Sequence, residues 1–528
     1  MKFKVTLLLF VILGCQKQET IDTFPIMGDL PMGEHPVGFQ TLFTHDLTKN
    51  AVPYADWDGH LYEEPTAEAG RPFQINVWYP AQPDSGDPLK YGDYVDLMGR
   101  QTNFGESEAQ KDFARKVFVR QTRDLRNILE AKNKVELSPE QLNQLLDLDV
   151  FARLNAKATE GKYPVVVYPN GSSPAYQSIT CEFLASHGYV TVAFAPKGRF
   201  SSGMEISTLG LELAVDDLEF VLGKISEAPN VDMDQVSILA NAISSSVGAA
   251  AVSRNEKIKA LISLEGGLPS SFEQRLLNES VFYQPENIRA PILFIYSPHP
   301  AIDPEYTFHL KYADRYYAHF PEMSEFAMLN YGMFDEFIPD IIGAHSGNIK
   351  KGYETANELV LRFLNQKIKG ESGALFDDAF TASREYIDTT FVLPGLPSPP
   401  NMAVLKDTFW KEGFDAIEDI YRQLKLEGNT QPFSKDFYTA YRNWLAWKKD
   451  EDYTNRLRLY ELAYDSYPES ARINYYVAYY SMKRELNEQA QRFYSQALSL
   501  VEADEELSVG EKSTLRTRAS DELNSLIK

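Results

Sequence analysis

The stretch that decides the fold is Val236-Ser-Ile-Leu-Ala-Asn-Ala-Ile-Ser-Ser-Ser-Val-Gly248. Val236 to Ala240 is a short apolar run with β-branched residues, which predicts a buried strand of a parallel sheet. Asn241 interrupts the run, and the small residues from Ser244 to Val252 predict a helix packed closely on that sheet. A strand, a sharp turn and a helix in this order are typical of the nucleophile elbow, G-x-S-x-G. In that motif the residues two before and two after the nucleophile must be small.

The turn allows two registers. In the first, Ala240 and Ser244 are the small flanking residues, and Ala242 takes the place of the nucleophile. A methyl group cannot attack a carbonyl, so this register predicts an elbow without a nucleophile. In the second, Ser244 and Gly248 flank Ser246, which lengthens the strand and shortens the helix by about one turn. We favour the Ala242 register and keep Ser246 as the alternative nucleophile. A third interpretation is a strand–helix junction that was never catalytic, because such a junction also favours small residues.

The composition limits the partners of the chain. It has 528 residues and a net charge of −23, and its acidic residues are spread along the sequence. This length allows two or three domains, each with its own core. The excess of acid disfavours nucleic acid and anionic lipid surfaces as partners. The sequence contains no Walker-type phosphate loop, no H-E-x-x-H motif and no paired-histidine spacing, so we expect no metal and no cofactor.

The first residues have the features of a secretion signal. Lys2 and Lys4 precede a short apolar segment, Val5 to Leu13, which is too short to span a bilayer. The sequence Ile12-Leu13-Gly14-Cys15 resembles the lipobox of bacterial lipoproteins. The resemblance implies acylation of Cys15 and a bacterial cell-envelope protein that a lipid anchor holds at a membrane, facing the periplasm or the exterior. A simple secretory signal with a chance cysteine is the alternative.

Residues 1–15 are therefore the predicted signal peptide, and residues 16–33 are a polar linker that contains Pro and Gly. With Cys15 lipidated, Cys181 is the only remaining thiol, so no disulfide and no cysteine metal site can form within one chain. We expect Cys181 to behave as a small buried hydrophobe.

Strands and helices alternate through residues 34–392. The predicted strands are Pro72–Pro80, Lys162–Tyr168, Tyr189–Phe194, Val236–Ala240, Ile258–Leu264 and Pro291–Tyr296. The predicted helices are Ala175–His187, with His187 as a cap before Gly188, Leu209–Ser226 and Tyr353–Lys369. Asp84–Asp93 is expected to be a turn-rich link. An insertion of two or three helices is expected at about 105–157, with Ser138-Pro-Glu-Gln141 as an N-terminal cap. Such alternation indicates an α/β domain with a doubly wound parallel sheet.

Five pieces of the chain carry a family resemblance. They are Pro36-Val-Gly-Phe-Gln40, Ile75-Asn-Val-Trp-Tyr-Pro80, Tyr163-Pro-Val-Val-Val-Tyr168, Phe183-Leu-Ala-Ser-His-Gly-Tyr189 and, without a gap, Asp232 to Gly266. The region from about Pro36 to Lys369 resembles the α/β-hydrolases of the platelet-activating-factor acetylhydrolase and dienelactone hydrolase group. The resemblance implies the α/β-hydrolase fold and, where the catalytic residues are present, hydrolysis of esters by a serine triad.

The sequence departs from the family at the positions of the catalytic residues. The resemblance places the family's nucleophile at Ala242, its acid at Glu265 and its histidine at Tyr331 in Tyr331-Gly-Met-Phe334. Its oxyanion loop resembles Asn170 to Ser173, that is Gly171, Ser172 and Ser173 after Asn170. Glu can replace Asp in orienting the base. Tyr has a pKa of about 10 and is a poor general base near neutrality.

These departures predict a domain without serine-triad chemistry, a binding or scaffold protein that keeps the pocket for a small ester-like or lipid ligand. The alternative is an active serine esterase or lipase-like hydrolase that uses Ser246. It would need His299, His309, His319 or His345 as its base. His345, in Gly343-Ala-His-Ser-Gly347, is the first choice. In a third hypothesis the hydrolase domain is only structural, and the C-terminal region docks a partner.

The C-terminal region follows a Pro-rich segment. Leu393-Pro-Gly-Leu-Pro-Ser-Pro-Pro-Asn401 predicts a semi-rigid linker at 393–404, before a helical domain at 405–528. Leu459-Tyr-Glu-Leu-Ala463 and Phe493-Tyr-Ser-Gln-Ala497 are 34 residues apart, which is the tetratricopeptide period. This predicts an all-α domain with two repeats and a degenerate one near Phe409 to Gln431. Repeats of this kind form concave surfaces for protein segments, so we expect a protein partner here. A helical array without a ligand is the alternative.

Overall fold

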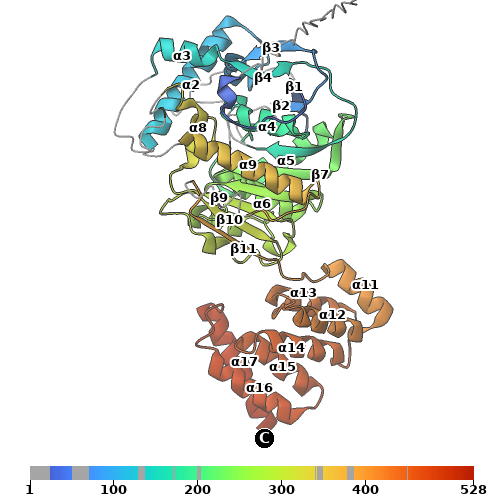
Figure 1. Ribbon diagram of the computed structural model, residues 1–528. Helices are drawn as coiled ribbons and strands as arrows, with labels where there is room; N and C mark the ends of the chain where they lie inside the picture. The colour runs from blue at the N-terminus through green and yellow to red at the C-terminus, as the bar shows by residue number, and fades with distance from the viewer. Residues whose placement is uncertain are drawn as a thin grey trace, which may run out of the picture. The chain divides into compact units, whose positions relative to one another are not determined.

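The chain forms two compact units (Figure 1). The computed structural model describes residues 24–49, 70–128, 137–169, 173–198, 204–338, 341, 349–376, 386–448 and 450–527. The first unit takes the described residues of Met1–Pro285, Ala290–Phe308 and Tyr316–Val392, and the second those of Glu286–Arg289, His309–Arg315 and Leu393–Lys528. Within these ranges, no helix combines the length and the apolar character that crossing a membrane requires.

A single mixed sheet organises the first unit. Among the described residues, 11 strands form it in the order β11-β10-β9-β8-β7-β5-β6-β2-β1-β4-β3. The strands are β1 (Val37–Asp46), β2 (Arg71–Pro80), β3 (Asp87–Lys90), β4 (Asp149–Leu154), β5 (Tyr163–Tyr168), β6 (Val190–Phe194), β7 (Val231–Asn241), β8 (Ile258–Leu264), β9 (Ile292–Tyr296), β10 (Arg315–His319) and β11 (Thr389–Leu393). The central strands β6, β5, β7, β8 and β9 are parallel, as predicted. On one side of them β2 pairs antiparallel with both β6 and β1, and β3 pairs antiparallel with β4.

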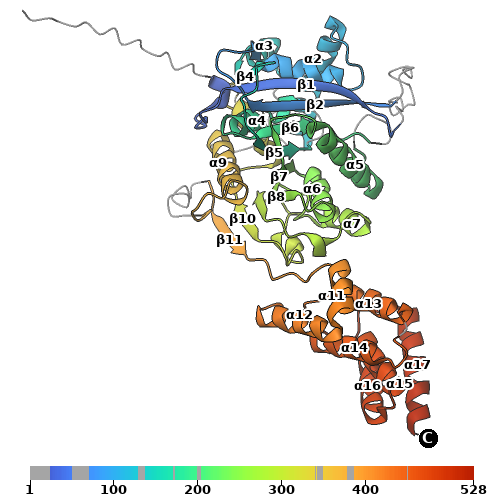
Figure 2. The same cartoon turned by 90° about the vertical axis from the view of Figure 1, so that its right-hand side faces the viewer.

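Helices cover both faces of the sheet. They are α1 (Tyr91–Asp96), α2 (Glu108–Ile128), α3 (Pro139–Leu146), α4 (Ser178–Ser186), α5 (Thr208–Ile225), α6 (Ile243–Arg254), α7 (Ser271–Glu279), α8 (Tyr331–Phe334) and α9 (Ile349–Lys367). Figure 2 shows α4 and α9 on one face and α5, α6 and α7 on the other. The predicted α/β architecture is thus confirmed, and the parallel strands between the two helical layers are buried on both sides.

Three local predictions on the helices are confirmed. Ser138 Oγ accepts a hydrogen bond from Gln141 N at 3.2 Å, and Gln141 Oε1 accepts one from Ser138 N at 3.0 Å, which completes a capping box at α3. His187 is the C-cap of α4, and Gly188 follows it with a φ of +80°. Cys181 is buried within α4.

The predicted helical insertion is wrong at its C-terminal end. Helices α2 and α3 lie within it, but Asp149–Leu154 forms strand β4, which pairs with β1 and β3. Strand β3 in turn lies in the stretch predicted to be a turn-rich link. The apolar spacing of 149–154 fits either a helix or a strand, and the neighbouring strands supply the backbone partners that decide between them.

The second unit is all-α, as predicted. Its helices are α11 (Met402–Glu412), α12 (Phe414–Leu426), α13 (Lys435–Trp447), α14 (Thr454–Ser466), α15 (Ala471–Lys483), α16 (Asn487–Leu500) and α17 (Val509–Ile527). The two motifs at the 34-residue period fall on α14 and α16. Their matching residues are all buried, namely Leu459, Tyr460 and Ala463, and Phe493, Tyr494 and Ala497. Residues 394–401, which contain the prolines, have neither helix nor strand.

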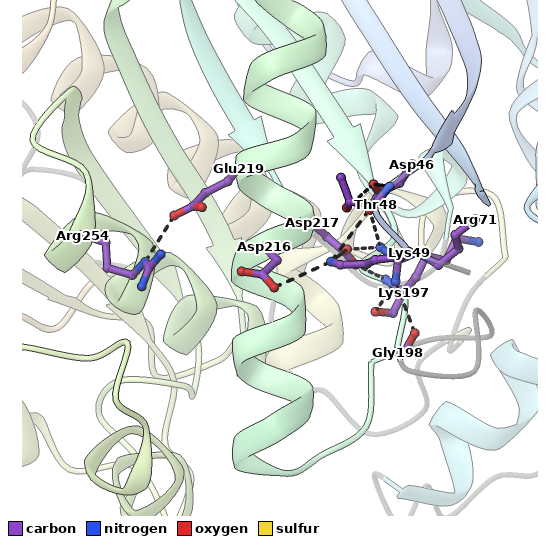
Figure 3. Close-up of polar contacts among 10 residues, drawn as sticks. All are labelled: Asp46, Thr48, Lys49, Arg71, Lys197, Gly198, Asp216, Asp217, Glu219 and Arg254. Carbon is purple, nitrogen blue, oxygen red and sulfur yellow. Dashed lines mark hydrogen bonds and ion pairs between the residues drawn. The ribbon is translucent and has the colours of Figure 1, made fainter. Parts of the chain in front are cut away.

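A buried ion network joins distant parts of the first unit (Figure 3). Asp217 on α5 is fully buried and accepts hydrogen bonds from Arg71, from Lys49 Nζ at 3.0 Å and from the backbone N of Lys197 at 2.7 Å. Arg71, which is 2% exposed, also lies 3.6 Å from the carboxylate of Asp46. The network therefore connects the end of β1, the start of β2, helix α5 and the segment after β6.

We expect Asp217→Asn to lower the free energy of unfolding by about 3–5 kcal/mol, because it leaves the buried guanidinium of Arg71 without its closest counter-charge. Denaturant unfolding of the full chain measures the loss. The matched control is Glu219→Gln, also on α5, whose carboxylate pairs with Arg254 at 3.2 Å where both side chains are more than one-third exposed. That control should cost less than about 1 kcal/mol. Equal losses in the two variants would contradict a structural role for the network.

Candidate functional site

A one-residue turn joins β7 to α6. The strand ends at Asn241 and the helix begins at Ile243, so Ala242 alone makes the turn, with φ 49° and ψ −131°. A positive φ is uncommon in a residue other than glycine and costs about 1–3 kcal/mol. Two backbone hydrogen bonds hold the turn: Ala242 N donates to Leu264 O at 2.9 Å, and Ala242 O accepts from Ser245 N at 2.8 Å. The strained residue of this elbow is therefore Ala242, and its side chain is a methyl group.

Small residues allow α6 to approach the sheet. A Cβ on Gly248 would lie 2.8 Å from Leu261 Cδ1 on β8 and 3.1 Å from Ile238 Cγ2 on β7. Larger side chains here would push the helix away from both strands. The small-residue run in the sequence thus reflects a close helix–sheet contact directly behind the turn.

Ser246, the alternative nucleophile, lies inside α6. Its side chain is 0% exposed, and its Oγ has no hydrogen-bond partner among the described residues. None of the described histidines is therefore hydrogen-bonded to it. His319 instead places Nδ1 2.6 Å from Asp388 Oδ1. His345 lies outside the described residues.

Glu265, at the predicted acid position, lies immediately after β8. It is 2% exposed, has a φ of 52°, and its backbone N donates to Ile295 O at 2.7 Å. Burial raises the pKa of its carboxyl to about 7, and the negative charge of the nearby Glu325 adds to this rise. Hydrogen bonds from Ser297 and from the backbone of Gly266 offset part of it. Near neutral pH this group is therefore divided between its neutral and charged forms.

The loop after Glu265 touches the elbow. Gly267 has a φ of +71°, and a Cβ on it would lie 2.3 Å from Ala242 O and 2.6 Å from Ser245 Cβ. Only glycine fits this approach of one backbone to another. The structure thus brings the predicted nucleophile position and the loop that carries the predicted acid into contact.

Tyr331, at the predicted base position, belongs to an aromatic layer. It is the first residue of α8 and is 1% exposed. Its hydroxyl is 2.9 Å from Thr122 Oγ1 on α2, and its ring stacks on Tyr176 at 5.6 Å. Burial raises the pKa of the Tyr331 hydroxyl above its ordinary value. Among the described residues no hydrogen bond joins Tyr331 to Glu265, so these two positions do not form an acid–base pair.

Asn330 is a site residue that the sequence analysis missed. It is fully buried, and its Nδ2 donates to Ala175 O at 2.7 Å and to Ser178 Oγ at 2.9 Å, while its backbone N donates to Tyr176 O at 2.8 Å. It therefore ties the turn before Tyr331 to the segment that follows the predicted oxyanion loop. Its only signal in the sequence is its place beside Tyr331, since a single asparagine forms no pattern. Thr122 and Ser297 were missed for the same reason.

The remaining predicted positions are only partly described. Ser173 is buried, and its Oγ accepts a hydrogen bond from Ala175 N at 3.1 Å, so it caps the short 3-10 helix Pro174–Tyr176. Asn170, Gly171, Ser172 and the lipidation position Cys15 lie outside the described residues. In the part of the chain that is described, no group of three or more His, Cys, Asp or Glu side chains is arranged to hold a metal ion.

Strand order and turn together identify the architecture of the first unit. Its centre is parallel, an antiparallel β1–β2 pair flanks that centre, and a strained single residue links the middle strand β7 to its helix. An acidic residue, Glu265, directly follows the next strand, β8. The first unit has an α/β-hydrolase fold. In this hydrolase-fold unit, the predicted nucleophile position is occupied by Ala242 and the predicted base position by Tyr331.

Comparison with known proteins gives structural likenesses only. No family model and no curated protein matches the sequence. Ferulic acid esterase from Streptomyces cinnamoneus is similar with a TM-score of 0.46 and 17% identity, over 69% of this chain and 98% of that one. Acylaminoacyl peptidase from Pyrococcus horikoshii has a TM-score of 0.31 and 17% identity, over 42% of this chain and 39% of its own. A puromycin-hydrolyzing peptidase of Mycobacterium tuberculosis has a TM-score of 0.31 and 15% identity, over 40% of this chain and 36% of its own.

Glu265 makes the stability of the hydrolase-fold unit depend on pH. Between the ordinary Glu pKa of 4.5 and the folded value of about 7, the folded state keeps a proton that the unfolded state has lost. This contribution is therefore fully present below pH 4.5 and is lost as the pH rises through 7. We expect the free energy of unfolding of the wild type, relative to Glu265→Gln, to fall by about 3 kcal/mol across this window. Denaturant unfolding at a series of pH values measures the difference.

The control for this experiment is Glu256→Gln, which removes an exposed carboxyl from the loop between α6 and β8. Its pH profile should run parallel to that of the wild type. A Glu265→Gln profile that also runs parallel to that of the wild type would show that the carboxyl of Glu265 does not titrate in this window, and would contradict a pKa raised by burial.

Proposed function

We propose that the hydrolase-fold unit is a binding domain that does not cleave esters by a serine triad. The observation that carries this proposal is the methyl group of Ala242 on the strained residue of the elbow, where a nucleophile would need its hydroxyl. An elbow that holds a non-glycine residue at φ 49° keeps the geometry of a catalytic turn while lacking its reactive atom.

The surroundings of the elbow support the same proposal. The Tyr331 hydroxyl is engaged with Thr122, and its raised pKa removes it further from the range of a general base. Glu265 has no imidazole partner to orient among the described residues, and its raised pKa reduces its negative charge at neutral pH. The side chain of Ser246 is fully buried and would have to become exposed to act as a nucleophile, so no observation favours the active-esterase alternative.

The ligand proposed for the elbow is a small ester-like or lipid molecule that is held without being cleaved. Ala242 is only half-buried, whereas the residues from Ser244 to Ala251 are buried. This partial exposure of the turn supports contact with a ligand there. We also propose that the helical repeats bind a segment of a partner protein, and that a lipid on Cys15 anchors the protein to a membrane of a bacterial cell envelope.

A fluorophosphonate probe tests the absence of serine-triad chemistry. We expect the purified wild type to be labelled at least about 10⁴-fold more slowly than an active serine esterase in the same reaction, because loss of one triad member already costs about this much. Gel fluorescence after a time course gives the rates. Ser246→Ala is the matched variant and should behave like the wild type. Stoichiometric labelling that disappears in Ser246→Ala would overturn the proposal and establish Ser246 as a nucleophile.

The anchor is tested in a bacterial host by membrane fractionation and by mass spectrometry of the mature N-terminus. We expect an acylated Cys15 in the membrane fraction, and we expect Cys15→Ser to release the protein, since the acyl chains supply the membrane affinity. Cys181→Ser is the control, because its thiol is buried and should not affect partitioning. A Cys15→Ser protein that remains in the membrane fraction would contradict lipidation as the anchor.

A further inference from the structure

The second unit contains a groove along three alternate helices of its array. Helices α13, α15 and α17 line it, and its volume is about 330 Å³, near the lower end of ligand pockets, which hold roughly 300–1,000 Å³. Arg442 comes from α13, Arg472, Tyr475 and Tyr476 come from α15, and Arg518 comes from α17. Cationic and aromatic side chains from three alternate helices of the array thus line the groove.

The groove reverses the sign of charge that prevails in the chain. Three arginines line it against one carboxylate, Glu511, whereas the whole chain carries a net charge of −23. Glu511 is paired with Arg472 at 2.6 Å. Within the described residues, neither Arg442 nor Arg518 has a carboxylate within ion-pair distance. Two guanidinium groups therefore face this groove without an anionic partner.

Two of the three acids that line the adjoining cavity are engaged, and the third, Asp436, has no ion pair among the described residues. This cavity of about 110 Å³ shares Arg472 with the groove. Glu506 there pairs with Lys435 at 2.8 Å, and Asp504 Oδ2 accepts a hydrogen bond from Ala471 N at 2.9 Å. These carboxylates consequently do not neutralise Arg442 or Arg518.

Arg442 is held in position for a ligand. Its guanidinium lies over the ring of Tyr476, 4.4 Å from the centroid, and its Nε and Nη2 donate to Asn443 Oδ1 at 3.2 and 2.9 Å. A guanidinium has five N–H donors, so donors remain for a further acceptor. Stacking on an aromatic ring limits the conformations that binding must freeze. Tyr475, which is 8% exposed, and Tyr476 form an aromatic wall beside it.

We propose that this groove binds an acidic segment of a partner protein. Carboxylates of the segment pair with Arg442 and Arg518, since a guanidinium offers a planar, two-pronged match to a carboxylate. The apolar parts of the segment pack on Tyr475 and Tyr476. The occupant follows from the local charge of the groove, because an uncharged segment leaves both guanidinium groups uncompensated. This inference rests on the proposed partner-binding role of the repeats and is independent of the chemistry of the elbow.

The test uses two fluorescein-labelled peptides, one alternating Leu with Glu and the other alternating Leu with Gln, titrated with the full chain and followed by anisotropy. We expect the Glu peptide to bind at least about tenfold more tightly than the Gln peptide, and its affinity to fall as ionic strength rises. Arg442→Gln and Arg518→Gln should each weaken binding of the Glu peptide about five- to tenfold and leave that of the Gln peptide unchanged. Arg422→Gln on α12, an exposed residue outside the groove, should change neither.

Thermal unfolding of each variant separates loss of binding from loss of fold. Arg518 is exposed and has no ion pair among the described residues, so Arg518→Gln should leave the unfolding temperature unchanged. This variant therefore tests the proposal even where Arg442→Gln lowers the unfolding temperature. Equal affinity for the two peptides, with no effect of either arginine, would overturn the acidic partner but leave partner binding intact. No saturation with either peptide by about 1 mM, the weak end of the affinity scale, would overturn both.

Discussion

The one-residue turn at Ala242 constrains the whole hydrolase-fold unit. Because a single residue reverses the chain, α6 must start directly behind β7 and lie against both β7 and β8, where Gly248 leaves room for it. The loop after β8 then has to pass the carbonyl of Ala242, which Gly267 permits. The strain at the turn persists because hydrogen bonds and close packing on both sides hold the backbone there.

Around this turn, the backbone has the conformation of an elbow, but the side chains are not those of a serine triad. The elbow has a strained backbone and a methyl side chain, and Tyr331, at the predicted base position, packs into an aromatic layer that contacts helix α2. The buried acid of Glu265 lies in surroundings that favour its neutral form. A fold of this kind can therefore support binding without the reaction, since function depends on the groups of the site and not on the architecture that presents them.

The two units differ in how their charged side chains are compensated. In the hydrolase-fold unit, buried charges such as Arg71 and Asp217 compensate one another within the core. In the helical unit, Arg442 and Arg518 face an open groove without a counter-charge among the described residues. A buried charge must be paired inside the protein, whereas a charge at a groove can be paired by a ligand. Arg71 and Asp217 therefore stabilise the fold, whereas Arg442 and Arg518 are available to a charged ligand.

The sequence by itself determined the features that neighbouring residues encode. Apolar runs predicted the central parallel strands, Ser138 and Gln141 predicted a capping box, small residues around Ala242 predicted a tight strand–helix junction, and a 34-residue period predicted the helical array. Tertiary structure alone decided the pairing of β3 and β4, the contact of Tyr331 with Thr122 across 209 positions, and the burial that raises the pKa of Glu265. It also brought Arg442 and Arg518 to one groove. Periodicity and caps are local in the chain, but strand partners, burial and electrostatic environment depend on residues far apart in sequence, and only the folded chain brings those together.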